Sequence, residues 1–258
     1  MKDKLIFFDI DGTIIDHYKK EIPRTTITAL KRLQANNHKI VIASGKGPVF
    51  IENLFNEIKI DTYIALNGNY VVYNNKVIYK EYLPENEVKA FCDYCLNNNI
   101  AFVVSDEYST KTLYKNDARV QEYYDEFTTP YPKVINEIND YSIYMQMSVM
   151  IAQEDEKHLI SLFPKLTFVR MSEFGMNVIP KNGMKEKGVI QILEHSHYQK
   201  EDTIAFGDGL NDISMFKLVN TSVAMGNANQ KTKDNATLIT DHISNDGLYK
   251  VCKKLNLF

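Results

Sequence analysis

Two acidic segments, far apart in the chain, carry side chains that could do chemistry together. Asp9-Ile10-Asp11-Gly12-Thr13 follows the apolar run Leu5–Phe8, and Gly207-Asp208-Gly209-Leu210-Asn211-Asp212 follows Thr203–Phe206. Each has the pattern of a loop that begins where a buried strand ends. Carboxylates gathered in such loops repel one another unless a cation neutralises them, and Mg²⁺ prefers oxygen ligands of this kind. We therefore expect a magnesium site, with a phosphate as the remaining ligand.

Cleavage of a phosphate ester needs a nucleophile, a proton for the leaving oxygen and positive charge near the phosphoryl group. Asp9 and Asp11 alternate along a chain that leaves a strand, so both can reach one crevice. One of them can attack phosphorus while the other handles the proton. Gly12 lets the chain turn sharply, and the Thr13 hydroxyl can fix that turn.

The remaining parts of such a site can also be assigned. Lys187, at the start of a helical segment, is the expected cation, and Lys185 is its rival two residues earlier. Ser44-Gly45 follows the second strand, where its hydroxyl and amides can hold a phosphate before the helix that begins at Pro48. Asp9, the backbone carbonyl of Asp11, and Asp208 would suffice as magnesium ligands, with Asp212 acting from outside the ligand set.

The elements that must position these loops alternate between strand and helix. Short apolar, β-rich runs predict strands, and apolar residues at helical spacing predict helices. The alternation predicts an α/β fold with a parallel sheet, whose ligands lie beyond the carboxyl ends of the strands. The predicted strands are 4–8, 39–43, 62–66, 203–206 and 221–224, and the predicted helices are 23–36, 48–58, 185–195, 212–218 and 248–255.

The pattern changes in the middle of the chain. A hairpin is predicted at Tyr70–Tyr73 and Lys76–Tyr79, and alternating apolar residues within Tyr141–Ile151 predict a half-buried strand. Residues 115–140 are polar and aromatic, with weak periodicity. We therefore predict a core formed by residues 1–81 and 181–258, interrupted by an α+β insertion at 82–180. Within it, helices are predicted at 84–96 and 154–163, and strands at 100–104, 166–171 and 177–179.

Bulk properties exclude several classes of protein. The 258 residues carry a net charge of -3, so no broad basic face for nucleic acid is expected. No apolar run approaches the ~20 residues that a membrane span needs, and no secretory signal is expected at the N-terminus. Cys92, Cys95 and Cys252 form no disulfide framework, which favours a reducing cytoplasm. We expect a cytoplasmic monomer or homodimer that binds a small molecule.

The motifs resemble those of the haloacid dehalogenase (HAD) superfamily, and more narrowly its Cof-type sugar-phosphatase-like branch. Asp9–Thr13 matches the first motif, Lys187-Gly188 fits the third and Gly207–Asp212 fits the fourth. Ser44-Gly45-Lys46 resembles the second motif, which is commonly Thr-Gly-Arg. Two further stretches resemble this branch, namely Asn67-Gly68 and Ala224-Met225-Gly226-Asn227-Ala228.

The resemblance implies a Rossmann-like parallel-sheet core with an inserted α+β cap that closes over the site and selects the substrate. Asp9 would form an aspartyl-phosphate, and Asp11 would protonate the leaving group and then activate water. Asp9, Asp11 and Asp208 would hold Mg²⁺. Lys46 departs from the family, because lysine lacks the planar fork of arginine. The implied phosphate or substrate contacts are Ile10, Ser44, Gly45, Lys187 and Asn211, supported by Asp212 and Thr13.

The sequence thus predicts a Mg²⁺-dependent phosphatase that acts on small phosphate monoesters, such as sugar phosphates. Two alternatives stay open. A phosphomutase or phosphotransferase would pass the phosphoryl group from the aspartate to an acceptor hydroxyl instead of water. A regulator without turnover would keep the same pocket only to bind a phosphoester.

Overall fold

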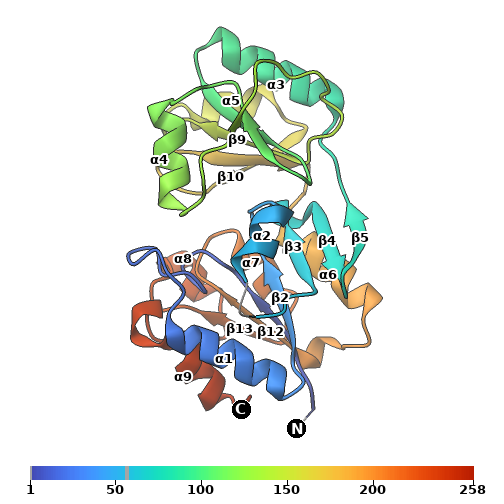
Figure 1. Ribbon diagram of the computed structural model, residues 1–258, viewed down its shortest axis with the longest axis vertical. Helices are drawn as coiled ribbons and strands as arrows, with labels where there is room; N and C mark the ends of the chain where they lie inside the picture. Colours follow the sequence, from blue (N-terminus) through green and yellow to red (C-terminus); the bar gives the residue numbers. More distant parts are fainter. Residues whose placement is uncertain (1, 56–57) are drawn as a thin grey trace.

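Two β-sheets, drawn one above the other in Figure 1, organise the chain. This computed structural model describes residues 2–55 and 58–258. In those residues the larger sheet has eight strands in the order β14-β13-β12-β1-β2-β3-β4-β5, and the smaller has six in the order β10-β11-β9-β6-β7-β8. The larger sheet combines strands from both ends of the chain, which brings the two acidic segments into one part of the molecule.

Parallel pairing sets the position of the acidic segments. β1 (Leu5–Phe8) lies between β12 (Thr203–Gly207) and β2 (Lys39–Ala43), parallel to both, and Phe8 pairs with Phe206 and Ile42. The parallel series continues through β3, β13 and β14, whereas β4 and β5 are antiparallel. The predicted parallel α/β core is confirmed. The other strands are β3 (Tyr63–Ala65), β4 (Tyr70–Tyr73), β5 (Lys76–Lys80), β13 (Thr221–Ala224) and β14 (Leu238–Ile239).

Helices cover both faces of the larger sheet. Ile6 and Phe8 of β1 pack with residues of α1 (Arg24–Ala35) and α9 (Gly247–Lys254). Leu5 and Phe7 join a second cluster with α6 (Lys185–His195) and α7 (Asp212–Phe216). A strand buried on both faces is apolar at every position, which explains the uninterrupted run of β1. The larger sheet and the helices that cover it form the larger lobe. Two further helices of this lobe are α2 (Pro48–Leu54) and α8 (Gln230–Asp234).

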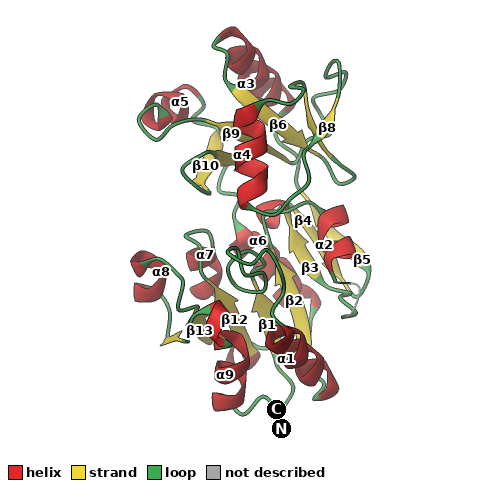
Figure 2. Ribbon diagram, turned by 60° about the vertical axis from the view of Figure 1, so that its left-hand side comes forward, coloured by secondary structure: helices red, strands yellow, loops and turns green. Residues whose placement is uncertain are grey.

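The smaller sheet and its helices form the smaller lobe. This sheet is mainly antiparallel, and different helices pack on its two faces. Met147 and Val149 of β9 (Gln146–Met150) lie in the core beneath α3 (Glu85–Asn97) and α5 (Glu156–Leu162). Met150 packs on the other face with α4 (Ala118–Glu126), whose C-terminal end points toward the larger sheet in Figure 2. The remaining strands are β6 (Ala101–Ser105), β7 (Thr110–Thr112), β8 (Lys133–Val134), β10 (Leu166–Arg170) and β11 (Met176–Pro180).

The predicted elements differ from the structure in a few places. The helix expected over 48–58 ends at Leu54, and the part of that prediction over 56–57 lies outside the described residues. The strand expected over Tyr141–Ile151 is confined to Gln146–Met150. No element was predicted for β7, α4, β8, α8 or β14, which are short or polar. In the described part of the chain, no helix is long and apolar enough to cross a membrane.

The stacked pair between β1 and β12 gives a test of this packing. The Phe8 and Phe206 rings are fully buried, with centroids 4.8 Å apart. We expect Phe206→Ala to lower the free energy of unfolding by about 3–5 kcal/mol, because it leaves a cavity between two central strands. Val77→Ala, at a position 46% exposed on β5, should change it by less than about 0.5 kcal/mol. Denaturant unfolding measures both, and equal losses would contradict this packing.

Candidate functional site

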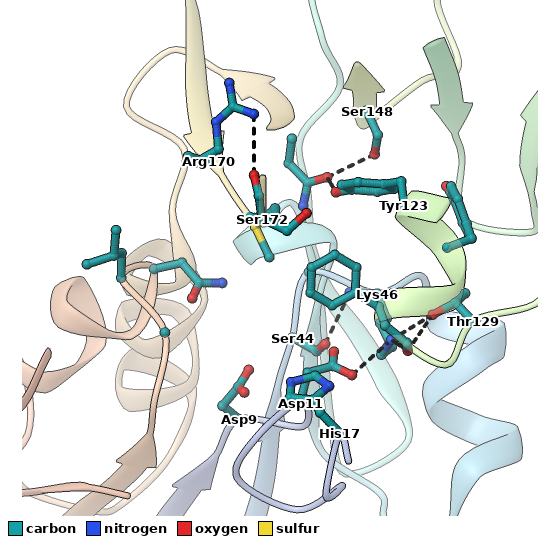
Figure 3. Close-up of a pocket in the computed structure, with 18 of the residues that line it drawn as sticks. Asp9, Asp11, His17, Ser44, Lys46, Tyr123, Thr129, Ser148, Arg170 and Ser172 are labelled. Carbon is teal, nitrogen blue, oxygen red and sulfur yellow. Dashed lines mark hydrogen bonds and ion pairs between the residues drawn. The ribbon is translucent and has the colours of Figure 1, made fainter. Parts of the chain in front are cut away.

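The loops at the carboxyl edge of the larger sheet face the smaller sheet across a cavity of about 390 Å³ (Figure 3). Both lobes contribute to its wall. The larger lobe supplies polar residues from the loops after β1, β2 and β12, and the smaller lobe supplies residues of β9, β10, β11 and α4. Lining residues of the larger lobe include Asp9, Asp11, Ser44, Asp208 and Asn211, and those of the smaller lobe include Tyr123, Phe127, Ser148, Arg170 and Asn177.

A buried lysine holds two of the aspartates. Lys185, the first residue of α6, is fully buried, and its Nζ donates to Asp9 Oδ1 at 2.5 Å and to Asp212 Oδ1 at 2.6 Å. The other oxygen of Asp212 accepts from the backbone N–H groups of Asp208 and Gly209, at 3.0 and 2.9 Å. Asp212 therefore fixes both the lysine and the loop that carries Asp208.

The expectation that Lys187 contacts the phosphate is wrong on geometry. Lys187 Nζ donates to both carboxylate oxygens of Glu81, at 2.9 and 2.6 Å, and the residue does not line the cavity. Two residues along a helix correspond to a rotation of about 200°, so Lys185 and Lys187 leave α6 in nearly opposite directions. Lys185, the rival considered in the sequence, occupies the place expected for Lys187.

Three carboxylates gather beside this lysine. One oxygen each of Asp9, Asp208 and Asp212 lie within 4.8 Å of one another, so the cluster could hold a metal ion. Burial raises the pKa of Asp9 to about 8, against the opposing effect of Lys185, and burial together with Asp9 raises the pKa of Asp208 well above its usual range. One lysine leaves excess negative charge here, and the all-carboxylate donor set fits a hard divalent cation.

Of the metal ligands expected from the sequence, Asp9 and Asp208 are brought together. Asp212, expected outside the ligand set, joins them in the cluster. The Asp11 carboxylate is not part of that cluster and instead forms an ion pair with Lys46, with 3.2 Å between Lys46 Nζ and Asp11 Oδ1. Asp11 also lines the cavity, which is where a proton donor for a leaving group must lie.

The segments Asp9–Thr13 and Gly207–Asp212 contact each other directly through side chains. Thr13 Oγ1 donates to Asp208 Oδ1 at 3.0 Å, and Asn227 Nδ2 donates to the Gly12 carbonyl at 2.8 Å. Gly12 has φ +80°, and a Cβ at this position would lie 2.0 Å from Asp208 Oδ2. Only glycine fits there, because both the conformation and the close approach exclude a side chain. Asn227 was noted in the sequence only as part of a family stretch, without a site role.

The other expected phosphate contacts fall into two groups. Ser44, Gly45 and Asn211 line the cavity, and Asn211 Nδ2 donates to Asn67 Oδ1 at 3.4 Å. The side chain of Ile10 instead packs in the core of the larger lobe, and its carbonyl oxygen accepts from backbone N–H groups at 2.8 Å. Ile10 can therefore meet a ligand only through its own backbone N–H.

Lys46 connects the two lobes. Its Nζ donates to the Phe127 carbonyl and to Thr129 Oγ1, both at 2.7 Å, in the segment that follows α4 (Figure 3). The same ammonium lies 4.5 Å from the centroid of the Phe50 ring. The replacement of the usual arginine thus places a compact cation with several donors between Asp11 and the smaller lobe.

Several residues of the cavity wall were missed in the sequence. Gln146 and Ser148 alternate with the core residues Met147 and Val149 along β9, and this alternation was interpreted only as a strand. Its polar members mark the face that meets the cavity. Tyr123 lies on α4, for which no helix was predicted, and only tertiary structure brings it to the wall.

The two lysines of α6 provide a direct test of this geometry. Lys185→Met leaves Asp9 and Asp212 without their buried cation, so we expect the free energy of unfolding to fall by about 3–5 kcal/mol. Lys187→Met breaks only a partly exposed pair and should cost about 1 kcal/mol or less.

The cost of Lys185→Met should grow with pH. Burial raises the pKa of Asp9 above its value in the unfolded chain. Ionisation of Asp9 therefore lowers the free energy of unfolding. Loss of the lysine raises that pKa further, so the two proteins diverge only above about pH 8, and the gap between wild type and Lys185→Met should be wider at pH 9 than at pH 6. Denaturant unfolding at both pH values measures it, and an effect of Lys187→Met as large as that of Lys185→Met would contradict the assignment.

Comparisons with known proteins show the family of the chain. A family model described as haloacid dehalogenase-like hydrolase matches residues 6–252. The Bacillus subtilis protein named "Putative phosphatase YkrA" is 35% identical over 257 residues, which cover 100% of this chain and 99% of that protein. "Phosphoglycolate phosphatase 1" of Saccharolobus solfataricus is 27% identical over 256 residues, covering 98% and 95%.

Solved structures share the whole architecture. A protein of Geobacillus kaustophilus HTA426 has a TM-score of 0.88 at 31% identity, covering 100% of both chains. A structure described as a HAD subclass IIB sugar phosphatase has a TM-score of 0.86 at 32% identity, covering 99% of this chain and 100% of that one. The chain therefore belongs to the haloacid dehalogenase-like hydrolases, and to their Cof-type branch.

Proposed function

We propose that this protein hydrolyses small phosphate monoesters with the help of Mg²⁺, through a phosphoryl group carried on Asp9. The reaction class follows from the family: the chain is a HAD-type phosphoric monoester hydrolase, with relatives named as phosphatases along its full length. The observation that carries the finer proposal is the buried contact of Lys185 with Asp9, next to Asp208.

The first half of the reaction would transfer the phosphoryl group to the protein. An Asp9 carboxylate oxygen attacks phosphorus, the ester P–O bond breaks, and Asp11 gives its proton to the leaving oxygen. Lys185 offsets the negative charge beside Asp9, while Ser44, Gly45 and Asn211, which line the cavity, would donate to the phosphoryl oxygens. Mg²⁺, held by Asp9 and Asp208, would supply further positive charge at those oxygens.

The second half would restore the carboxylate. Asp11, now ionised, takes a proton from a water molecule whose oxygen attacks phosphorus, and the bond between Asp9 and phosphorus breaks. Free phosphate leaves, and Asp9 is regenerated. The contact from Lys46 to Asp11 and to the segment after α4 keeps the proton-transfer group beside the wall that meets the leaving group.

The substrate is proposed to be a sugar phosphate or a similar metabolite. The cavity of about 390 Å³ is lined by polar groups of both lobes among aromatic and apolar side chains, which suits a small hydroxyl-bearing ester. One structural relative is itself described as a sugar phosphatase. A reducing cytoplasm is the proposed setting, because Cys92, Cys95 and Cys252 are buried free thiols.

Asp9→Asn tests the covalent step. The substitution keeps the shape of the side chain but removes the nucleophile, so hydrolysis of p-nitrophenyl phosphate with Mg²⁺ should fall by about 10³-fold or more. Asp93→Asn, at an exposed position of α3, should leave the rate unchanged. A wild-type rate in Asp9→Asn would end the proposal. Transfer of phosphate to an added alcohol without release of free phosphate would favour the phosphotransferase alternative.

Asp208→Asn tests the metal. Removing one carboxylate of the cluster should raise the Mg²⁺ concentration for half-maximal activity at least about tenfold, because loss of even an outer-shell partner has an effect of this size. A Mg²⁺ titration of the p-nitrophenyl phosphate rate measures the change. An unchanged titration, or full activity of wild-type protein in a metal chelator, would show that the cluster does not serve a divalent cation.

A further inference from the structure

The cavity wall opposite the aspartates carries a buried amide on the smaller sheet. Asn177 of β11 is 4% exposed and pairs with Ser148 of β9 in the antiparallel register. Its neighbours Met176 and Val178 lie in the core beneath α3 and α5. Side chains alternate along a strand, so Asn177 projects from the opposite face, and it lines the cavity.

Two hydroxyl groups fix the orientation of this amide. The Tyr123 hydroxyl donates to Asn177 Oδ1 at 2.9 Å and the Ser148 hydroxyl donates to the same oxygen at 2.8 Å, as the dashed lines in Figure 3 show. Both lone pairs of the carbonyl oxygen are then engaged. Asn177 Nδ2, the other atom of the amide, donates to none of the residues that the structure describes. This nitrogen is not one of the buried polar atoms left without a partner, so it is open to the cavity, where a ligand oxygen can accept its hydrogen bond.

The free amide nitrogen lies close to the proposed phosphate loop. A Cβ built on Gly45 would be 3.2 Å from Asn177 Nδ2, so the absence of a side chain at Gly45 permits this approach. Since Ser44-Gly45 is assigned to the phosphoryl group, Asn177 reaches the end of the substrate where that group joins the organic part.

The charge of this wall indicates what the amide would bind. Arg170 also lines the cavity, but its Nε and one Nη donate to Glu156 Oε2 at 3.1 and 2.9 Å, and the other Nη donates to the Ile151 carbonyl at 2.9 Å. Its charge is thus already matched within the protein. A neutral amide suits a hydroxyl oxygen of the leaving group better than a second anionic group.

We propose that Asn177 is a specificity-determining residue that donates a hydrogen bond to an oxygen on the carbon next to the ester carbon. The enzyme then prefers phosphate esters that carry a hydroxyl group at this vicinal position. Tyr123 and Ser148 are positioning residues that hold the amide in its donating orientation. This inference rests on the proposed phosphatase function and adds the chemical class of the leaving group.

Two esters of nearly equal size isolate this hydrogen bond. 2-Hydroxyethyl phosphate and propyl phosphate differ by a hydroxyl in place of a methyl group. The wild-type kcat/KM should be about tenfold higher for the hydroxyl ester, and Asn177→Ala should bring the ratio close to one. The rate with p-nitrophenyl phosphate, which has no such hydroxyl, should change by less than about twofold.

Two more variants complete the experiment. Tyr123→Phe removes one of the hydroxyls that hold Asn177 and should lower the ratio only in part, and this result keeps the test available if Asn177→Ala does not fold. Asn139→Ala, at an exposed position of the same lobe, should keep the wild-type ratio.

The possible outcomes distinguish failure of the Asn177 inference from failure of the proposed phosphatase function. If wild type hydrolyses p-nitrophenyl phosphate but shows equal kcat/KM for the two alkyl esters, or if Asn177→Ala retains the preference, the inference fails and the phosphatase function stands. A uniform loss on all three esters in folded Asn177→Ala would assign the amide to the phosphoryl group and also contradict the inference. Hydrolysis of none of the esters by wild type would overturn both.

Discussion

A buried ammonium group between two carboxylates is the interaction on which the rest of this site depends. Lys185 has no exposed surface, so its charge is tolerable only because Asp9 and Asp212 lie within hydrogen-bonding distance. Although burial alone lowers the pKa of a lysine, the pKa of Lys185 is raised because Asp212 and Asp9 outweigh it. The cation therefore stays charged across the physiological range, and its partners are held in one geometry.

The fold explains how three distant segments supply this contact. Asp9 follows β1, Asp212 lies beyond β12, and Lys185 opens α6, which packs against β3, β4 and α7. Parallel pairing of β1 with β12 brings the two acidic loops to the same edge of the sheet, as parallel sheets generally do for ligand sites. Glycines are needed where these loops approach closely, and Gly12 beside Asp208 is the tightest example. The arrangement of these side chains is thus a consequence of strand order.

The smaller lobe reaches the loops of the larger lobe through several polar contacts. Lys46 reaches the segment after α4, and Gln146 Nε2 donates to the Gly45 carbonyl at 3.0 Å. Gln146 Oε1 also accepts from Asn67 Nδ2 at 2.8 Å. These contacts tie the Ser44-Gly45 loop to the cavity wall of the smaller lobe. Such polar links can be exchanged for hydrogen bonds to water at modest cost in free energy.

Much of the core could be predicted from the sequence, because its strands are short apolar runs that end in motifs with a chemical meaning. The acidic loops, the parallel sheet and the placement of Asp9 near Asp208 follow from those runs. The choice between Lys185 and Lys187 could not be made, since both precede the same glycine in a helix and only the packing of α6 decides which one points inward.

The cavity residues of the smaller lobe could not be predicted for a different reason. Asn177 and Ser148 are isolated polar residues within apolar strands, and Tyr123 belongs to a stretch with weak periodicity. Their position on the cavity wall depends on contacts across the sheet and with α4. No local sequence pattern predicts these contacts. The limits of the inserted domain, 82–180, stay a prediction, although the strands of the smaller sheet all fall inside them.

The most direct measurement is a crystal structure of the protein with Mg²⁺ and aluminium fluoride as a mimic of the transferring phosphoryl group. The account predicts the metal bound by Asp9 and Asp208 at about 2.1 Å, the mimic in line with an Asp9 oxygen, and the Lys185 ammonium beside it. A metal bound away from these carboxylates, or a mimic contacted by Lys187 with Lys185 remote from it, would contradict the account.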